Sequence, residues 1–372
     1  MNVLKNFVRV VMIALWLGIF GLFLFVPQMR FFRHVEKSIA ILAWPTDIDP
    51  HVIADFERET GIKVYLSYFQ DYGELFVKLR SSKGLGYDLV TPVDYIVKPM
   101  IEQGLLKPLD TSRCAFWSDL NPQLLDLYYD KGNRYTIPYF WGMFGIGINR
   151  DAFPGKEMPA SWKLLFDTAV YDGPVGMLDD PKELVAIGAQ YLFGSMQTGE
   201  NLLLRSTSSD RESDDKVSFD RASMKQVQNL LIEQKKRVVM YTDNRASYLL
   251  LSQTAPVVLT LSYEVARVMR FYKNIDFLIP QEGSFLLVDN WAMPASSTKD
   301  DLVYQFLNYM YRRDVLKRMV EQFLFYPPLL VDGVEAVSGL RLPTTVDMQR
   351  AEFIMSPVSE SQLTDFWIEL KA

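Results

Sequence analysis

Cysteine and histidine are scarce in this chain of 372 residues, which contains one cysteine, Cys114, and two histidines, His34 and His51. A disulfide framework needs paired cysteines, and a Cys/His zinc site needs several such ligands. Neither can be assembled from these residues, and we expect no metal and no cofactor. We interpret Cys114 as a small core residue rather than as a nucleophile.

Sequence motifs of covalent catalysis and nucleotide binding are also missing. No Gly-x-Ser-x-Gly sequence occurs. Gly145-Ile146-Gly147 lies inside a strand-like run and lacks the third glycine of a dinucleotide-binding loop. A secreted hydrolase with two carboxylates remains an alternative, because a sequence does not reveal the separation of two carboxyl groups.

Positive charge is in short supply outside the N-terminal segment. The chain has 39 lysines and arginines against 45 aspartates and glutamates, a formal net charge of −6. Residues 1–37 carry +4, so residues 38–372 carry −10. An acidic body repels nucleic acid and favours cationic partners. We therefore expect no nucleic-acid partner.

Only one long uncharged hydrophobic run is present, from Val10 to Val26. As a helix, at about 1.5 Å per residue, this run approaches the hydrocarbon thickness of a bilayer. Lys5 and Arg9 precede it, as in a secretory signal. Neither a small-x-small cleavage site nor a cysteine for lipid attachment follows. Residues 1–37 are therefore predicted to form an uncleaved signal anchor, a transmembrane helix, with a cleaved signal as the alternative.

After this segment, strand-like and helix-like patterns alternate. The strand-like runs are residues 39–43, 63–69, 87–91, 139–149, 173–178, 256–261 and 283–294. Helical patterns cover residues 50–59, 72–80, 95–103 and 300–321, and a further helix begins at Asp180. Repeated βα units predict an α/β fold with a mostly parallel sheet. A body of roughly 335 residues exceeds one compact core, so two lobes are expected. The polar stretch 205–220 is interpreted as a surface loop.

Aromatic and acidic side chains follow several of these strands, where ligands bind in such sheets. Trp44 and Tyr95 each follow a strand-like run, and core packing is the alternative for both. Asp289 ends an apolar run, where a solvated loop is the alternative. Tyr326 precedes Pro327, and a rigid turn is its alternative.

Asp180 and Glu183 are three residues apart at a predicted helix start, so both carboxylates project to one side. With Pro181 they also match a capping box, in which the carboxylates would bind backbone N–H groups instead of a ligand. Spacing alone does not decide between these interpretations. Carboxylates together with aromatic faces suit an organic polycation, whose ammonium groups need charge partners and whose methylenes pack on rings.

Taken together, the motifs resemble the spermidine/putrescine-binding proteins of bacterial polyamine ABC importers. The likeness extends from about residue 39 to residue 326. The matching stretches are FERETGIKV (56–64), YDLV (87–90), IPYFWG (137–142), IGIN (146–149), PASW (159–162) and Tyr326-Pro327.

The resemblance implies a type II periplasmic-binding-protein fold, in which two α/β lobes close around a ligand like a hinge. Lobe 1 would comprise residues 38–141 and 287–331, and lobe 2 residues 142–286 and 332–372. The implied partners are a polyamine ligand and an ABC permease of the inner membrane. A periplasmic, membrane-tethered monomer is expected.

The resemblance also assigns ligand-binding residues one by one. Trp44 and Tyr95 match family aromatics, Asp180 and Glu183 the carboxylate pair for one terminal amine, Asp289 the central carboxylate, and Tyr326 a further aromatic. Departures are a family tyrosine replaced by Asp47, a serine by Val93, and two pocket tryptophans by Leu259 and Leu287. Asp47 adds a candidate carboxylate, so the choice among polyamines stays open.

Two further classes stay open as alternatives. One is a binding protein for another solute, ferric ion or an amino acid, with Tyr128-Tyr129 as candidate iron ligands against an alternative of surface aromatics at a helix end. The other is a membrane-anchored sensor domain without a transporter.

Overall fold

The structure, a computed structural model, describes residues 11–12, 14–16, 37–45, 47–194, 221–242, 245–329, 342–354 and 360–372. The polar stretch 205–220 lies outside these residues. Most of the predicted anchor does too: of residues 10–26 only 11–12 and 14–16 are described, and these are helical. Within the described parts of the chain, no helix is both long enough and apolar enough to cross a bilayer.

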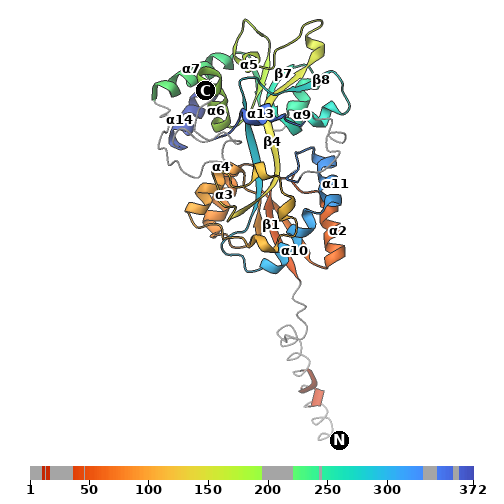
Figure 1. Ribbon diagram of the computed structural model, residues 1–372. Coiled ribbons are helices and arrows are strands. Elements are labelled where there is room, and N and C mark those ends of the chain that lie inside the picture. Colours follow the sequence, from red (N-terminus) through yellow and green to blue (C-terminus); the bar gives the residue numbers. More distant parts are fainter. Residues whose placement is uncertain are drawn as a thin grey trace.

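Two lobes joined by long strands make up the body, as the sequence predicts (Figure 1). The strands are β1 (Ser38–Ala43), β2 (Lys63–Tyr68), β3 (Leu89–Val90), β4 (Thr136–Asn149), β5 (Val175–Met177), β6 (Val238–Tyr241), β7 (Val257–Leu261), β8 (Ile275–Leu278), β9 (Ser284–Ala292) and β10 (Ala351–Phe353). The α-helices are α2 (Pro50–Thr60), α3 (Tyr72–Ser82), α4 (Asp94–Glu102), α5 (Lys163–Phe166), α6 (Pro181–Phe193), α7 (Arg221–Lys235), α8 (Ala246–Leu251), α9 (Ser262–Met269), α10 (Asp300–Met310), α11 (Arg313–Phe323), α13 (Thr345–Gln349) and α14 (Glu360–Lys371). Short 3-10 turns cover Thr111–Arg113, Trp117–Asp119, Pro122–Leu124 and Arg150–Ala152.

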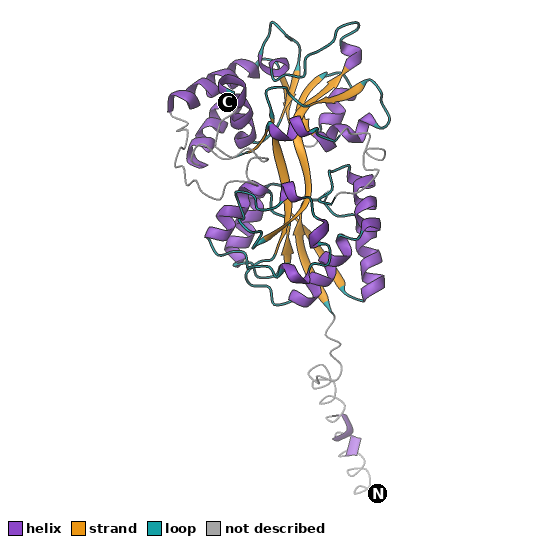
Figure 2. Ribbon diagram, in the orientation of Figure 1, coloured by secondary structure: helices purple, strands orange, loops and turns teal. Residues whose placement is uncertain are grey.

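The strands follow one hydrogen-bonded order, β2-β1-β3-β9-β4-β7-β5-β6, with β10 beside β9 and β8 beside β4. We call the lobe with β1–β3 the first lobe and the lobe with β5–β8 the second. In the first lobe β1 is parallel to β2 and β3, and in the second β5 is parallel to β6 and β7. β4 is antiparallel to β9 and to β7, and β9 is also antiparallel to β3. The sheet is therefore mixed, with helices on both sides of the strands in each lobe (Figure 2).

β4 and β9 connect the lobes, and every residue of both strands is buried. Gly142 pairs with Leu287 in their ladder. The predicted lobe boundaries, 141/142 and 286/287, thus lie opposite each other on this strand pair. After β10 the described chain ends in α14, which packs against α6 and α7 of the second lobe. The division of the chain at these residues remains a prediction.

Two glycines of β4 allow close packing of the second lobe. A β-carbon on Gly145 would lie 2.7 Å from the carbonyl oxygen of Leu278 and against the ring of Phe277. On Gly147 it would lie 2.9 Å from Leu250 Cδ1. The Gly145-Ile146-Gly147 sequence therefore serves strand packing rather than nucleotide binding.

The single helix predicted over residues 300–321 is wrong, because the chain forms α10 and α11 with a break at Tyr311 and Arg312. Arg312 has an extended backbone, with φ −62° and ψ 138°. Tyr311 is buried, its ring stacks on Phe116 at 3.7 Å, and its hydroxyl donates to the carbonyl of Pro138. Tertiary contacts thus overrule the helical periodicity at this point.

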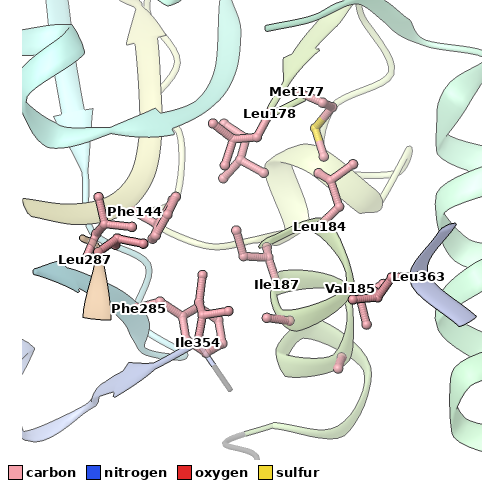
Figure 3. Packing of buried hydrophobic residues seen from close by; sticks show 14 of the residues in the cluster. Phe144, Met177, Leu178, Leu184, Val185, Ile187, Phe285, Leu287, Ile354 and Leu363 are labelled. Atoms are coloured by element: carbon pink, nitrogen blue, oxygen red, sulfur yellow. The ribbon is translucent and has the colours of Figure 1, made fainter. Parts of the chain in front are cut away.

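Buried apolar side chains fix the position of α6 (Figure 3). Leu184 and Ile187 of α6 belong to the same buried cluster as Phe144 of β4 and Phe285 and Leu287 of β9. Burial of such side chains contributes about 1.5–3 kcal/mol each. The packing holds the N-terminus of α6, where two predicted ligand carboxylates lie, close to the connecting strands.

Candidate ligand-binding cleft

A cavity of about 450 Å³ opens between the two lobes. Six of the seven predicted ligand residues line it: Trp44, Asp47, Tyr95, Asp180, Glu183 and Asp289. The segments that carry them follow β1, β3 and β5 or lie on β9, in keeping with ligand sites beyond the carboxyl ends of parallel strands. The volume is in the usual range of small-molecule sites, about 300–1,000 Å³. The structure brings these residues together, and their contact with a ligand remains a prediction.

Tyr326 is the predicted residue that the structure places outside the cavity lining. Its side chain is 1% exposed and packs on Trp141, with ring centres 4.6 Å apart. Its backbone also forms an antiparallel bridge with Trp141. Successive side chains of an extended segment point to opposite sides. The neighbouring Phe325 therefore lines the cavity instead.

An aromatic surface covers the side of the cavity that belongs to the first lobe. The rings of Trp44 and Tyr72 stack at 5.6 Å with an angle of 26°, and Tyr95 meets Tyr72 edge-on at 5.7 Å. Buried Phe69 supports this surface at 5.4 Å from Trp44 and 5.6 Å from Tyr72. Such faces pack on methylene chains and attract cations.

Asp47 and Asp289, which we call the central carboxylates, are both buried at the cavity wall. The Tyr72 hydroxyl donates to Asp289 at 3.0 Å, and Asp47 accepts from the Thr91 hydroxyl at 2.9 Å and from the Trp44 backbone N–H at 3.3 Å. Within the described chain, the hydrogen-bond donors to both carboxylate side chains are neutral hydroxyl and backbone N–H groups. Burial raises the pKa of Asp289 to about 7, and burial followed by the charge of Asp289 raises the pKa of Asp47. A cation at this position would relieve the cost of ionising both groups.

Asp180 and Glu183, which we call the α6 carboxylates, occupy the first turn of α6. Pro181 begins the helix, and Asp180 Oδ1 accepts the backbone N–H groups of Lys182 at 2.7 Å and Glu183 at 3.1 Å. The capping interpretation is therefore confirmed for Asp180. Because both carboxylates also line the cavity, capping does not remove them from the cleft.

The α6 carboxylates adjoin the aromatic surface at Tyr95. The Lys182 ammonium, also in the first turn of α6, lies 5.4 Å from the centre of the Tyr95 ring. Burial is the main cause that raises the pKa of Tyr95, followed by the charges of Asp180, Glu183, Asp94 and Asp289.

α9 supplies a side of the cavity that the sequence analysis did not identify. The Tyr263 ring packs edge-on against Phe325 at 4.4 Å. One turn along the helix, Arg267 Nη1 lies 2.9 Å from Glu264 Oε1. Burial raises the pKa of Tyr263, Asp289 and Glu264 raise it further, and Arg267 lowers it. Tyr263 directly precedes the pair Glu264–Arg267 on α9, which we call the α9 ion pair.

Two other sequence interpretations change with the structure. Leu259, expected at a family tryptophan position, is fully buried and outside the lining, whereas Leu261 and Leu287 line the cavity. Tyr128 and Tyr129 lie in a turn rather than at a helix end and pack on Phe353, away from the cavity lining.

Cys114 is buried, as expected for a core residue, and burial raises the pKa of its thiol to about 11. The described residues contain no cluster of histidine, cysteine and carboxylate side chains suited to a metal ion.

The missed residues follow strands that the sequence analysis had recognised. Tyr72 comes four residues after β2, and Tyr263, Glu264 and Arg267 follow β7 directly. Applying the strand-end rule to every strand would have selected these segments.

A cleft lined by residues of both lobes and crossed by two connecting strands defines a solute-binding protein. The family of bacterial extracellular solute-binding proteins matches residues 51–336. This match covers more than half of the chain, and the chain belongs to that family.

Individual relatives agree with the resemblance seen in the sequence. The putrescine-binding periplasmic protein PotF of Escherichia coli is 28% identical over 364 residues, which cover 91% of this chain and 92% of PotF. The spermidine/putrescine-binding periplasmic protein of the same organism is 28% identical over 297 residues, 79% of this chain and 78% of the relative. A solved structure from Listeria monocytogenes, assigned to spermidine/putrescine ABC transport, is 26% identical, with a TM-score of 0.74 and coverage of 90% and 99%. These matches confirm the two-lobed periplasmic-binding-protein fold.

Proposed function

We propose that this protein captures a polyamine of the spermidine/putrescine class in the interlobe cleft and delivers it to an ABC permease. The observation that carries the proposal is the charge of the cavity. Its described lining includes seven carboxylate side chains and one guanidinium, next to a stacked aromatic surface. The ammonium groups of a polyamine would pair with the carboxylates, and its methylene segments would pack on the aromatic surface.

Capture would follow from the arrangement of the cleft. The α6 carboxylates hold one ammonium group, the central carboxylates hold another, and the chain between them lies on Trp44, Tyr72 and Tyr95. Closure of the lobes would exclude water and strengthen each charge interaction. A ligand favours the closed form only through contacts that it makes better in that form.

A thermal-shift screen tests this function. Residues 38–372 are mixed with putrescine, cadaverine, spermidine or spermine, and with 4-aminobutyrate or ferric citrate as competitors of other classes. A ligand present at 100 times its Kd stabilises the folded state by about 2.7 kcal/mol, which is visible as a higher Tm. We expect a shift with at least one polyamine. A shift with ferric citrate or 4-aminobutyrate alone would reject the proposal.

The double substitution Asp180→Asn/Glu183→Gln separates ligand binding from capping. Asparagine caps helices about as well as aspartate, so the Tm of the ligand-free protein should stay within a few degrees of the wild type. Polyamine affinity should fall by tenfold or more, since charge-assisted hydrogen bonds contribute about 1.5–3 kcal/mol. Calorimetry gives the affinity. A lower Tm together with unchanged affinity would leave capping as the only role of this pair.

Binding without turnover is part of the proposal. A carboxylate-pair hydrolase needs one acid held protonated beside a carboxylate that stays ionised, so the two pKa values must be pushed apart. Burial raises the pKa of both central carboxylates, and the charge of Asp289 raises that of Asp47 further. We expect no turnover across a panel of glycosides, and hydrolysis of any of them would contradict this part of the proposal.

We also propose that the protein acts in the periplasm, as its relatives do by name, and that residues 1–37 tether it to the inner membrane. The uncharged run 10–26 supports the tether. A tether would raise the effective concentration of the binding protein at its permease. Retention of the protein in the membrane fraction after a carbonate wash would support it, and release of the mature chain into the soluble periplasmic fraction would reject it.

A further inference from the structure

One guanidinium lies among the carboxylates of the cleft, and it belongs to Arg267. No other lysine or arginine is among the described residues that line the cavity. Arg267 is held to Glu264 at 2.9 Å, with the Arg267 side chain 31% and the Glu264 side chain 6% exposed. An arginine stays charged at every physiological pH. The carboxylate of Glu264 is therefore already paired with a cation that belongs to the protein.

The α9 ion pair and the α6 carboxylates lie near different parts of the cleft. The Lys182 ammonium of α6 lies 5.4 Å from the centre of the Tyr95 ring. Tyr95 in turn packs edge-on against Tyr72, whose hydroxyl donates to Asp289. The α9 ion pair follows Tyr263, which packs on Phe325 in another part of the lining. A ligand held at the α6 carboxylates and Asp289 therefore leaves the α9 ion pair among the remaining charged groups of the cavity.

We propose that Arg267 determines specificity by closing this part of the cleft to an ammonium group, so that the site favours a diamine over a triamine or tetra-amine. The inference rests on the proposed polyamine function. A third ammonium group placed at the α9 ion pair would have to share Glu264 with the guanidinium and would be repelled by it in a partly buried setting, where charges interact more strongly than in water. The two other carboxylates of the lining are already engaged. Asp179 pairs with Lys371, and Asp71 accepts the backbone N–H of Glu74 as the cap of α3. A diamine needs only the α6 and central carboxylates and avoids this repulsion.

An anionic ligand end at Arg267 is less well supported by the same contacts. A carboxylate arriving there would compete with Glu264 for the guanidinium and would enter a lining that carries seven carboxylates. We therefore do not propose an anionic ligand, and the test measures the affinity of 4-aminobutyrate as the alternative.

Calorimetric titration of the full-length protein with putrescine, cadaverine, spermidine and 4-aminobutyrate tests the inference. The wild type should bind a diamine at least about tenfold more tightly than spermidine, a difference of about 1.4 kcal/mol. In Arg267→Gln, the ratio of spermidine affinity to putrescine affinity should rise at least about tenfold. Arg267→Lys retains the charge and should retain the preference for diamines. Arg150→Gln is the matched control, because Arg150 pairs with Asp276 in the same lobe, outside the cavity lining.

Two results would overturn the inference and leave the proposed function in place. The first is polyamine binding with the same affinity ratio in Arg267→Gln and the wild type. The second is wild-type spermidine binding that is as tight as diamine binding. Binding of 4-aminobutyrate that is lost in Arg267→Gln would also overturn it, because the guanidinium would then hold an anionic ligand end. If the wild type binds no polyamine at all, the proposed function itself fails.

Discussion

Replacing Asp289 with asparagine is expected to weaken polyamine binding by about 10- to 150-fold while raising the Tm of the ligand-free protein. The loss of affinity follows from the lost charge on a buried hydrogen-bonding partner, about 1.5–3 kcal/mol. The gain in stability follows from burial, which raises the pKa of Asp289 to about 7. At pH 8 the folded protein bears the cost of an ionised, buried carboxylate, and a neutral amide of the same shape removes it.

Calorimetry with putrescine and a thermal melt at pH 8 measure the two effects in the same preparation. Asp276→Asn provides the control, because Asp276 forms a partly exposed ion pair with Arg150 at 2.6 Å and does not line the cavity. The control should bind polyamine like the wild type and should not gain stability. Unchanged affinity in Asp289→Asn would remove Asp289 from the binding site.

Polyamine binding is expected to weaken by about tenfold or more when the pH is lowered from 8 to 6. The ammonium groups of the ligand stay protonated over this range, as lysine does. Below pH 7, Asp289 takes up a proton that the ligand must displace, and each displaced proton costs up to about tenfold in affinity per pH unit. The raised pKa of Asp47 acts in the same direction.

The contribution of Asp289 to the stability of the ligand-free protein should change in the opposite direction, rising as the pH falls. In the unfolded chain an aspartate has a pKa of about 3.9, well below the folded value of about 7 for Asp289. The folded state therefore binds the proton first as the pH falls, so the stabilising contribution is complete below about pH 4 and is lost as the pH rises through 7.

Other titratable groups near the central carboxylates do not reverse this expectation. Burial raises the pKa of Asp94, so this group also favours the folded state at acidic pH. The pKa values of the surrounding phenols are raised as well, which keeps the phenols neutral between pH 5 and 8: Tyr72, Tyr95, Tyr129, Tyr139 and Tyr263.

Thermal melts with and without putrescine at pH 5.5, 6.5 and 8 test both expectations: weaker polyamine binding at acidic pH, and a larger contribution of Asp289 to ligand-free stability at acidic pH. The shift caused by the ligand should grow with pH. The Asp47→Asn/Asp289→Asn double variant should lack the part of the acid-side stabilisation that these two groups supply. Equal polyamine affinity of the wild type at pH 6 and pH 8 would show that no proton is exchanged for the ligand.

The architecture could be predicted from the sequence because its elements are locally specified. β1 to α4 alternate as apolar runs and amphipathic helices, and each predicted element formed within about three residues of its expected bounds. The break at Tyr311 could not be predicted, because it depends on a stacking contact with Phe116 from a distant part of the chain. Local periodicity contains no information about such a contact.

The candidate site was predictable where a strand end carried a chemically distinctive side chain. Trp44 and Tyr95 were found in this way, whereas Asp289 was found at the end of an apolar run and lies inside β9. Phe325 and Tyr326 show the limit of the approach, since adjacent residues of an extended segment face opposite sides and the sequence does not say which side meets the cleft. Arg267 was missed for another reason: a lone basic residue at helical spacing from Glu264 resembles an ordinary surface ion pair until its burial is known.

A crystal structure of the protein grown with putrescine tests most directly whether carboxylates of both lobes meet around one amine-bearing ligand. We predict a diamine in the cleft with one ammonium nitrogen within hydrogen-bond distance of Asp289 and the other at Asp180 or Glu183, and with its methylenes on Trp44. A ligand bound without contact to any of these three carboxylates would contradict the mechanism.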